Sequence, residues 1–256
     1  YMSGTDAVTS RPLALTMGEP AGIGGEIGLR SWRALAPKWA AAAVPGEPPA
    51  SFFVIDDPDR LAALSRQLGL GIPVTAIAAP AEAATVFPKA LPVLPLSLPA
   101  PILPGRPNPE NATAVAASIE RAVALVQAGD AAAVVTNPIH KETMYGGGFR
   151  FPGHTEFLGH LAGGTTTTVM MIVCPGLRVV PVTVHVPLAR VPGALSTAAI
   201  VHAGRLADTA LRRDFGIARP RLAVAGLNPH AGEGGAMGRE EIDVIAPAVA
   251  ALRHEA

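Results

Sequence analysis

The chain has 256 residues, enough for one large or two smaller domains with a sizeable core. Lysine plus arginine and aspartate plus glutamate both number 20, so a formal net charge of zero gives no bulk attraction to nucleic acid or to an anionic membrane surface. The single cysteine, Cys174, excludes an intramolecular disulfide framework. Because no apolar run approaches the roughly 18 residues of a membrane span, we expect a soluble protein, and the single cysteine is typical of a reducing cytoplasm.

The first third of the chain predicts alternating strands and helices. Residues 13–17 (LALTM) predict a buried strand, and the glycine-rich segment after it leads into a helix from about Gly25. This order is typical of phosphate-binding turns, but Ile27 stands where the third glycine of G-x-G-x-x-G would be. The loop is therefore either part of a site or a plain tight turn. Three further elements are predicted next: a strand over 51–55, a helix over 59–69 and a strand over 74–77.

Proline recurs every few residues between positions 80 and 109, which is typical of extended edge segments and turns. Pro92 and Pro95 predict that residues 91–98 are not a central strand. We place the boundary between two lobes at the end of this stretch. The first lobe is predicted to span 11–109 and the second 110–256.

The remaining sequence continues the alternation. An apolar face and a terminal Gly129 predict a helix over 110–128. Further strands are predicted over 131–136, 166–174, 179–186 and 221–227, and further helices over 193–214 and 239–252. Strands and helices in alternation predict the α/β class with a mostly parallel sheet.

Three histidines fall where ligands bind in such folds. His154 stands directly ahead of a predicted helix, with Thr155 as its N-cap and Glu156 in its first turn, and a helix N-terminus binds anions. His185 and His230 lie at or beyond the carboxyl ends of predicted strands, where ligands bind in open α/β sheets. On one rim, these imidazoles would supply two metal ligands and an anion-binding group. The alternative is that they are ordinary loop histidines.

His140 is a weaker candidate. It lies beside Lys141 just beyond the predicted strand at 131–136. The other histidines, at positions 160, 202 and 254, fit polar surface or helix positions.

Five motifs carry a resemblance to a known family. In chain order they read LTMGEPAGIGGEI, TNPIHK, FPGHTEFL, VTVHVPL and GLNPHAGEGGAMG. Together they resemble the 4-hydroxythreonine-4-phosphate dehydrogenase (PdxA) family over nearly the whole chain. The resemblance implies an isocitrate/isopropylmalate-dehydrogenase-like fold with two α/β/α lobes and a cleft between them. It also implies NAD or NADP, a divalent metal (zinc, magnesium or cobalt), and a homodimer with its active site at the interface.

The same resemblance implies roles for particular residues. His154 and Thr155 match substrate-binding residues of the family, and His185 and His230 match metal ligands. The family's third metal histidine and later substrate contacts are expected beyond Ala256, as is the segment that completes the first lobe. We therefore expect the natural protein to continue past Ala256, and the 256-residue chain alone to be inactive and aggregation-prone. At the position of Gly25 relatives often carry proline, a departure that should loosen the turn.

The implied reaction is the NAD(P)-dependent oxidation of 4-phosphohydroxy-L-threonine to 2-amino-3-oxo-4-phosphooxybutanoate. Decarboxylation to 3-amino-2-oxopropyl phosphate follows, within pyridoxal 5'-phosphate biosynthesis. A dehydrogenase for a related sugar acid, threonate or erythronate 4-phosphate, is the nearest alternative. Two others are a metal-dependent hydrolase with Glu156 or Glu233 as its base and a non-catalytic ligand-binding protein. Nicotinamide reduction distinguishes a dehydrogenase from both.

Overall fold

The structure is a computed structural model that describes residues 11–41, 51–164 and 168–255. The chain divides into two compact units, Tyr1–Gly163 and Gly164–Ala256, and each is described by itself. In the described residues, no helix is long and apolar enough to cross a membrane.

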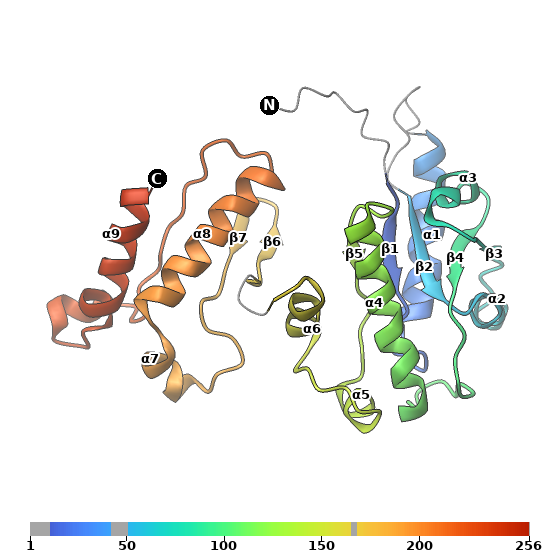
Figure 1. Cartoon of the computed structure of the whole chain (residues 1–256), viewed down its shortest axis with the longest axis horizontal. Coiled ribbons are helices and arrows are strands. Elements are labelled where there is room, and N and C mark those ends of the chain that lie inside the picture. Colours follow the sequence, from blue (N-terminus) through green and yellow to red (C-terminus); the bar gives the residue numbers. More distant parts are fainter. Residues whose placement is uncertain (1–10, 42–50, 165–167, 256) are drawn as a thin grey trace. The chain divides into compact units, whose positions relative to one another are not determined.

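The first unit is built on a parallel sheet of five strands in the order β3-β4-β2-β1-β5 (Figure 1). The strands are β1 Leu13–Thr16, β2 Phe52–Asp56, β3 Val74–Ala76, β4 Leu91–Pro95 and β5 Val134–Val135. The α/β class with a mostly parallel sheet is therefore confirmed. The predicted strands over 13–17, 51–55 and 74–77 are also confirmed, to within one residue at each end.

Helices cover both faces of this sheet (Figure 1). Alternate residues of β2 point to opposite faces, as the pleat requires. Phe52 and Val54 pack in one core cluster with residues of α1 (Gly24–Ala41) and α2 (Pro58–Gln67). Phe53 and Ile55 pack on the other face with residues of α3 and α4. The bounds of these helices are α3 Ala83–Val86 and α4 Ala112–Ala128, and the 3-10 helix η1 Pro80–Glu82 directly precedes α3.

The two predicted lobes do not coincide with the compact units. The predicted second lobe includes helix α4 and strand β5, but both pack on the sheet of the first unit. Ala122 of α4 is fully buried against Phe53 and Ile55, and Val134 pairs with Ala14 of β1. The apolar face of α4 needs this sheet as its partner, so the proline-rich stretch connects parts of one unit instead of separating two.

The prediction that Pro92 and Pro95 keep residues 91–98 out of a central strand is wrong. Strand β4 lies between β3 and β2 in the sheet. Proline has no amide hydrogen, so neighbouring residues make the backbone hydrogen bonds between the strands. Leu91 N donates to Pro73 O at 2.9 Å, and Leu96 N donates to Asp56 O at 2.9 Å. Burial of the leucine and valine side chains of β4 offsets the amides that proline lacks.

Helix α4 follows its prediction closely, and its neighbours are short. It ends at Gly129, whose left-handed φ of 82° forms the C-cap. Strand β5 has two residues and borders only β1, so the predicted strand over 131–136 is confirmed only over Val134–Val135. The remaining elements of the unit are η2 Pro109–Asn111, α5 Lys141–Gly146 and α6 His154–Leu161.

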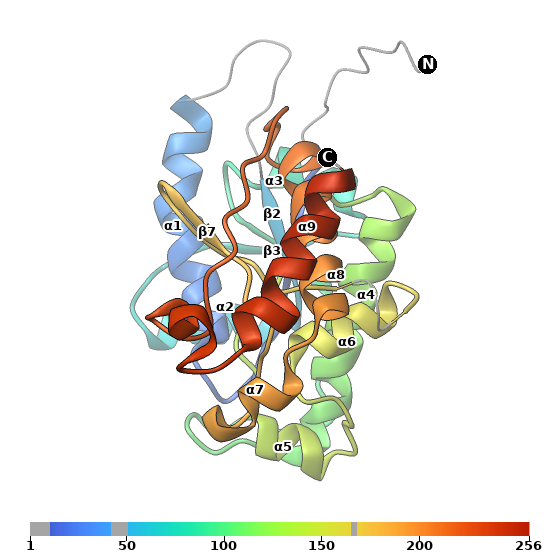
Figure 2. The ribbon, with the colours of Figure 1, turned by 90° about the vertical axis from the view of Figure 1, so that its left-hand side faces the viewer.

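The second unit has its core between two helices, α8 (Thr197–Arg213) and α9 (Ala246–Glu255) (Figure 2). Its two strands, β6 (Ile172–Cys174) and β7 (Leu177–Val179), form an antiparallel hairpin. The other elements are η3 Leu188–Arg190, α7 Val191–Ala194, the 3-10 turn η4 Ala231–Gly235 and the π-helical turn η5 Glu241–Ile245. The predicted helices over 193–214 and 239–252 correspond to α8 and to η5 with α9.

Two predicted strands of this unit are wrong. Residues 180–186 and 221–227 have no strand assignment, and only three residues of the predicted strand over 166–174 form one, with part of it outside the described residues. A strand exists only where a neighbour supplies its backbone partners. Within the described part of this unit, only β6 and β7 pair with each other.

Candidate functional site

The glycine-rich loop after β1 packs against the segment that follows β5. A Cβ on Gly18, whose φ is +70°, would lie 2.6 Å from the Cβ of Asn137. A Cβ on Gly24 would lie 2.9 Å from the carbonyl oxygen of Met17. The side-chain amide of Asn137 donates to Thr16 O at 2.9 Å and joins the two segments. Packing alone therefore explains why these two positions carry glycine.

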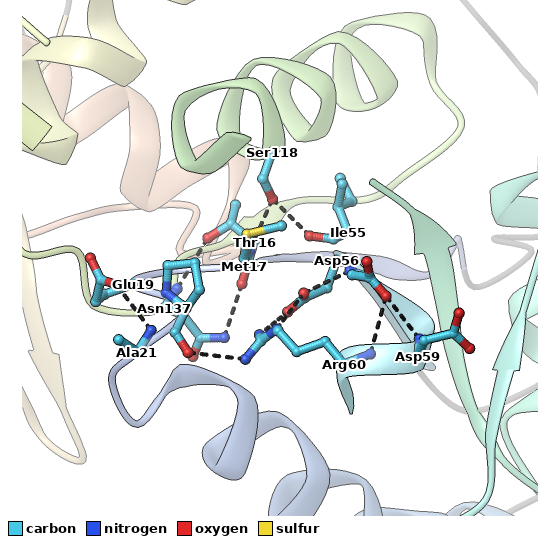
Figure 3. A network of polar contacts seen from close by, with 12 residues as sticks. Thr16, Met17, Glu19, Ala21, Ile55, Asp56, Asp59, Arg60, Ser118 and Asn137 are labelled. Carbon is cyan, nitrogen blue, oxygen red and sulfur yellow. Dashed lines mark hydrogen bonds and ion pairs between the residues drawn. The ribbon is translucent and has the colours of Figure 1, made fainter. Parts of the chain in front are cut away.

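A buried ion pair holds the other side of the same loop (Figure 3). Asp56, at the end of β2, is fully buried, and Arg60 of α2 donates from Nε to its Oδ1 at 2.9 Å and from Nη2 to its Oδ2. Nη1 of Arg60 donates to Pro20 O in the loop at 3.2 Å. Burial raises the pKa of the Asp56 carboxyl above its ordinary range, while the charge of Arg60 opposes that rise. The pair thus fixes the glycine-rich loop to α2.

Ser118 of α4 joins the carboxyl ends of β1 and β2 (Figure 3). Its Oγ accepts from Met17 N at 2.9 Å and donates to Ile55 O at 2.9 Å, and the residue is fully buried. Sequence reasoning missed Ser118 together with Asp56 and Arg60. A serine within the apolar face of the helix was the available signal, because a buried hydroxyl requires partners.

An aromatic cluster holds the loop before α6 against that helix. The rings of Phe149 and Phe157 meet edge to face with centroids 4.9 Å apart, and Phe151 lies 4.9 Å from Phe157. The imidazole of His160 lies 5.1 Å from Phe151. This cluster fixes the start of α6, and it gives His160 the helix-surface role that the sequence predicts for it.

The start of α6 differs from its prediction by one residue. Gly153 is the N-cap, with no side-chain capping bond, so the prediction of Thr155 as N-cap is wrong. Glu156 lies in the first turn as predicted, and its Oε2 would be 3.5 Å from a Cβ on Gly153. Because that carboxylate folds back toward the helix start, it complements the positive end of the helix dipole without a hydroxyl cap. Thr155, the second helical residue, is left without a capping role.

His154 is the first residue of α6, and its imidazole has an unused hydrogen-bonding atom. Nε2 is buried and has no hydrogen-bond partner in the part of the chain that the structure describes. Leaving a buried polar group unsatisfied costs about 1–3 kcal/mol. Burial also lowers the pKa of His154 below its ordinary value, so the imidazole is neutral at pH 7. A neutral imidazole can still donate one hydrogen bond to an anion.

His140 has a local role. It is the N-cap of α5, and its Nδ1 accepts from Thr143 N at 3.4 Å and lies 2.6 Å from Thr143 Oγ1. Helix capping of this kind accounts for the histidine without a ligand.

His185 lies in an irregular segment instead of at the end of a strand, so that part of the prediction is wrong. It is exposed and has a φ of +56°. Among the described residues, only His185, Ala231 and Glu233 combine a positive φ with a side chain. Such a conformation costs on the order of 1–3 kcal/mol and is concentrated at functional sites. All three strained positions lie at, or within three residues of, the two histidines predicted to bind metal.

His230 precedes a tight loop of left-handed residues. Ala231, Gly232, Glu233 and Gly234 have φ values of 50°, 71°, 44° and 68°. This backbone brings Glu233 Oε1 to 3.2 Å from His230 Nδ1, with both side chains more than half exposed. Residues 221–227 before it are not a strand, so here too the predicted strand end is wrong.

The contacts of the His230 imidazole are those of a histidine that can bind a metal ion. An imidazole that binds a metal usually gives its other nitrogen to a carboxylate, which fixes the tautomer. Glu233 occupies that position at Nδ1, which leaves Nε2 available as a ligand. Among the described residues, no group of three or more histidine, cysteine, aspartate or glutamate side chains is arranged to hold a metal ion.

The predicted site residues fall in both units. His154 and Thr155 belong to the first unit, whereas His185 and His230 belong to the second. Their meeting on one rim therefore stays a prediction.

The chain is similar to a family of biosynthetic proteins. The family described as pyridoxal phosphate biosynthetic protein PdxA matches residues 49–256. A 4-hydroxythreonine-4-phosphate dehydrogenase of Caulobacter vibrioides is 49% identical over 251 residues, which are 96% of this chain and 71% of that protein. A protein of the same name from Methylorubrum extorquens is 48% identical over 255 residues, covering 97% of this chain and 70% of that protein.

Solved structures agree with these matches. A 4-hydroxythreonine-4-phosphate dehydrogenase of Klebsiella pneumoniae is 38% identical with a TM-score of 0.77, covering 96% of this chain and 73% of that one. A terephthalate 1,2-cis-dihydrodiol dehydrogenase of Burkholderia xenovorans is 27% identical with a TM-score of 0.62, covering 96% and 71%. Both relatives are dehydrogenases, although their names give different substrates.

Proposed function

The chain belongs to the family of pyridoxal phosphate biosynthetic protein PdxA, and from this premise we propose that it oxidises 4-phosphohydroxy-L-threonine with NAD or NADP. The observation that carries the proposal is the sequence identity to two proteins named 4-hydroxythreonine-4-phosphate dehydrogenase. It is 49% over 96% of the chain for one and 48% over 97% for the other. The enzyme is thus an oxidoreductase of pyridoxal phosphate biosynthesis. Its product is 2-amino-3-oxo-4-phosphooxybutanoate, which loses carbon dioxide to give 3-amino-2-oxopropyl phosphate.

In this reaction the C3 hydrogen leaves as hydride to the nicotinamide, and the hydroxyl proton goes to solvent. His185 and His230 are the residues that would hold a divalent metal such as zinc, magnesium or cobalt. A metal held there supplies a positive charge that lowers the pKa of the C3 hydroxyl and stabilises the ketone oxygen. The Glu233 carboxylate supports this role by holding the Nδ1 proton of His230.

The phosphate is assigned to the start of α6. His154 supplies a neutral imidazole whose Nε2 lacks a partner in the described chain, and Thr155 supplies a hydroxyl in the same helical turn. Anchoring the phosphate at one end of the substrate orients the carbon that reacts at the other. Because Glu156 already lies at this helix terminus, we assign the phosphate to side-chain donors more than to the helix dipole.

We further propose a cytoplasmic homodimer with its active site at the interface. The single cysteine and the family membership support this assignment. Light scattering on the full-length protein measures the dimer mass. Two inactive variants, each altered at a different site residue, are then mixed so that mixed dimers form. If both subunits contribute residues to one active site, the mixed dimers should regain part of the activity.

The function is tested by nicotinamide reduction in the full-length protein. We expect absorbance at 340 nm to rise when 4-phosphohydroxy-L-threonine is added with NAD or NADP, and a chelator to stop the rise. Added zinc, magnesium or cobalt should restore it. Product formation without nicotinamide reduction would indicate a hydrolase, and bound phosphate with no turnover would indicate a binding protein.

The same assay separates the related substrates. The dihydrodiol dehydrogenase relative shows that a similar fold, at 27% identity, accepts another substrate. Threonate 4-phosphate and erythronate 4-phosphate are therefore compared at equal concentration. A higher kcat/KM with either sugar acid than with 4-phosphohydroxy-L-threonine would reassign the substrate while retaining the dehydrogenase chemistry.

Replacing His154 with alanine should raise the KM for the phosphorylated substrate by about 10- to 100-fold. A hydrogen bond to a charged group contributes about 1.5–3 kcal/mol, and each 1.4 kcal/mol corresponds to tenfold in affinity. Steady-state kinetics measure KM and kcat, and elemental analysis measures the metal content, which should not change. His202→Ala, which removes an exposed histidine of α8, is the control, and it should leave KM unchanged. Loss of metal with an unchanged KM would show that His154 has a different role.

A further inference from the structure

Glu241 reaches back to the loop that carries His230. It is the first residue of the π-helical turn η5, and its Oε1 accepts from Asn228 N at 2.9 Å. Its Oε2 is shielded from solvent and lacks a partner among the described residues, although the residue itself lies near the surface. A Cβ on Gly232 would lie 3.0 Å from that oxygen. The carboxylate thus lies directly against the inner side of the loop.

Asn228 is the point at which this loop is fastened. Its Oδ1 accepts from His230 N at 2.8 Å, and its carbonyl oxygen accepts from Ala231 N at 2.8 Å. Its Nδ2 donates to Met237 O at 3.1 Å, so the side chain also closes the far end of the loop. Any displacement of Asn228 is therefore passed directly to the backbone of His230.

The loop needs such a fastening because its own backbone is strained. Ala231 and Glu233 have left-handed φ values of 50° and 44°, which side chains rarely adopt. Contacts outside the strained residues must keep them in this conformation. Glu241 is suited to that role, because Ile245 and Ala248, which follow it on η5 and α9, are buried in the core with residues of α8. The N–H of Asn228 also holds the pKa of the Glu241 carboxyl below its ordinary value.

We propose that Glu241 is a positioning residue for His230, acting through Asn228. The proposal rests on the proposed function in that His230 is taken as a metal ligand. The contact spans 13 residues, so it is not the cap of a neighbouring helical turn. Partners that orient a metal ligand from outside the coordination sphere typically contribute 10- to 100-fold to metal affinity, and Glu241 belongs to that class.

The test uses the full-length protein and two readouts. Hydrogen exchange without metal measures the protection of the Asn228 and His230 amides, and titration with cobalt(II) measures metal affinity from the visible absorption. In Glu241→Ala we expect at least tenfold faster exchange of both amides and 10- to 100-fold weaker cobalt binding. Glu241→Gln, which retains an acceptor, should lie between this variant and the wild type. Glu241→Asp, one methylene shorter, should behave like the alanine variant.

Asp243→Asn is the matched control, because it removes an acidic group of the same turn that pairs with Arg239 at the surface. It should change neither readout. If the Asn228 and His230 amides exchange at the same rate in Glu241→Ala as in the wild type, Glu241 does not hold the loop and the proposal is wrong. If they exchange faster but the cobalt affinity is unchanged, Glu241 stabilises the loop without positioning a metal ligand, and the proposal is again wrong. If the wild type itself binds no cobalt, the metal assignment of the proposed function fails, while the exchange of the His230 amide still decides whether Glu241 holds the loop.

Discussion

Replacing His230 with alanine in the full-length protein is expected to abolish metal binding and nicotinamide reduction while leaving the fold intact. Removing one imidazole leaves too few protein ligands for a catalytic metal, which usually has three. The side chain of His230 is 66% exposed, so its loss should change the free energy of unfolding by only about 0.5 kcal/mol. Elemental analysis measures the metal, and circular dichroism during thermal unfolding measures the fold.

The same experiment applies to His185. Both His185→Ala and His185→Gly remove the imidazole and should lose the metal, and the glycine variant also relieves the left-handed φ of 56°. His202→Ala replaces an exposed histidine on α8 and is the control. Full metal content in the His185 or His230 variants would disprove the ligand assignment.

The largest effect on stability is expected from Arg60→Met. This change leaves the fully buried Asp56 carboxylate without its cation and should cost about 3–5 kcal/mol of unfolding free energy. It also removes the bond to Pro20 O, so the glycine-rich loop should lose protection from hydrogen exchange. Denaturant unfolding measures the first effect. Arg30→Met is the control, because the pair of Arg30 with Glu26 on α1 is exposed and contributes less than about 1 kcal/mol.

The loss of unfolding free energy in Arg60→Met should depend on pH. Burial already raises the pKa of Asp56, and removing Arg60 raises it further, so the folded variant holds a proton that the unfolded chain has released. Stability then falls as pH rises, and the loss should be smaller at pH 5 than at pH 8. A double variant with Asp56→Asn should recover more than half of the loss. A loss that is equal at both pH values would mean that Asp56 is not the group left unpaired.

The candidate site could be predicted from sequence only where its residues form short motifs. His154, His185 and His230 each lie in such a motif, and their roles stay predictions. Strained backbone lies at His185 and in the loop that follows His230. Asn228 is within the motif of His230 but showed its role only when its side chain was seen to bridge His230 and Met237. Glu241 could not have been found, because nothing in the intervening 12 residues indicates which carboxylate folds back.

By itself, the sequence determined the features that depend on neighbouring residues: the α/β alternation, the strands β1 and β2, the helix α4 with its left-handed Gly129, and the motifs of the family. Only the tertiary structure decided which sheet α4 and β5 join, that β4 with its two prolines is internal, and that residues 180–186 and 221–227 are not strands. The reason is that helices and turns are determined by residues only a few positions apart in the sequence. Strand pairing and buried polar contacts, such as Ser118 with Ile55 across 63 positions, depend on partners that only folding brings together.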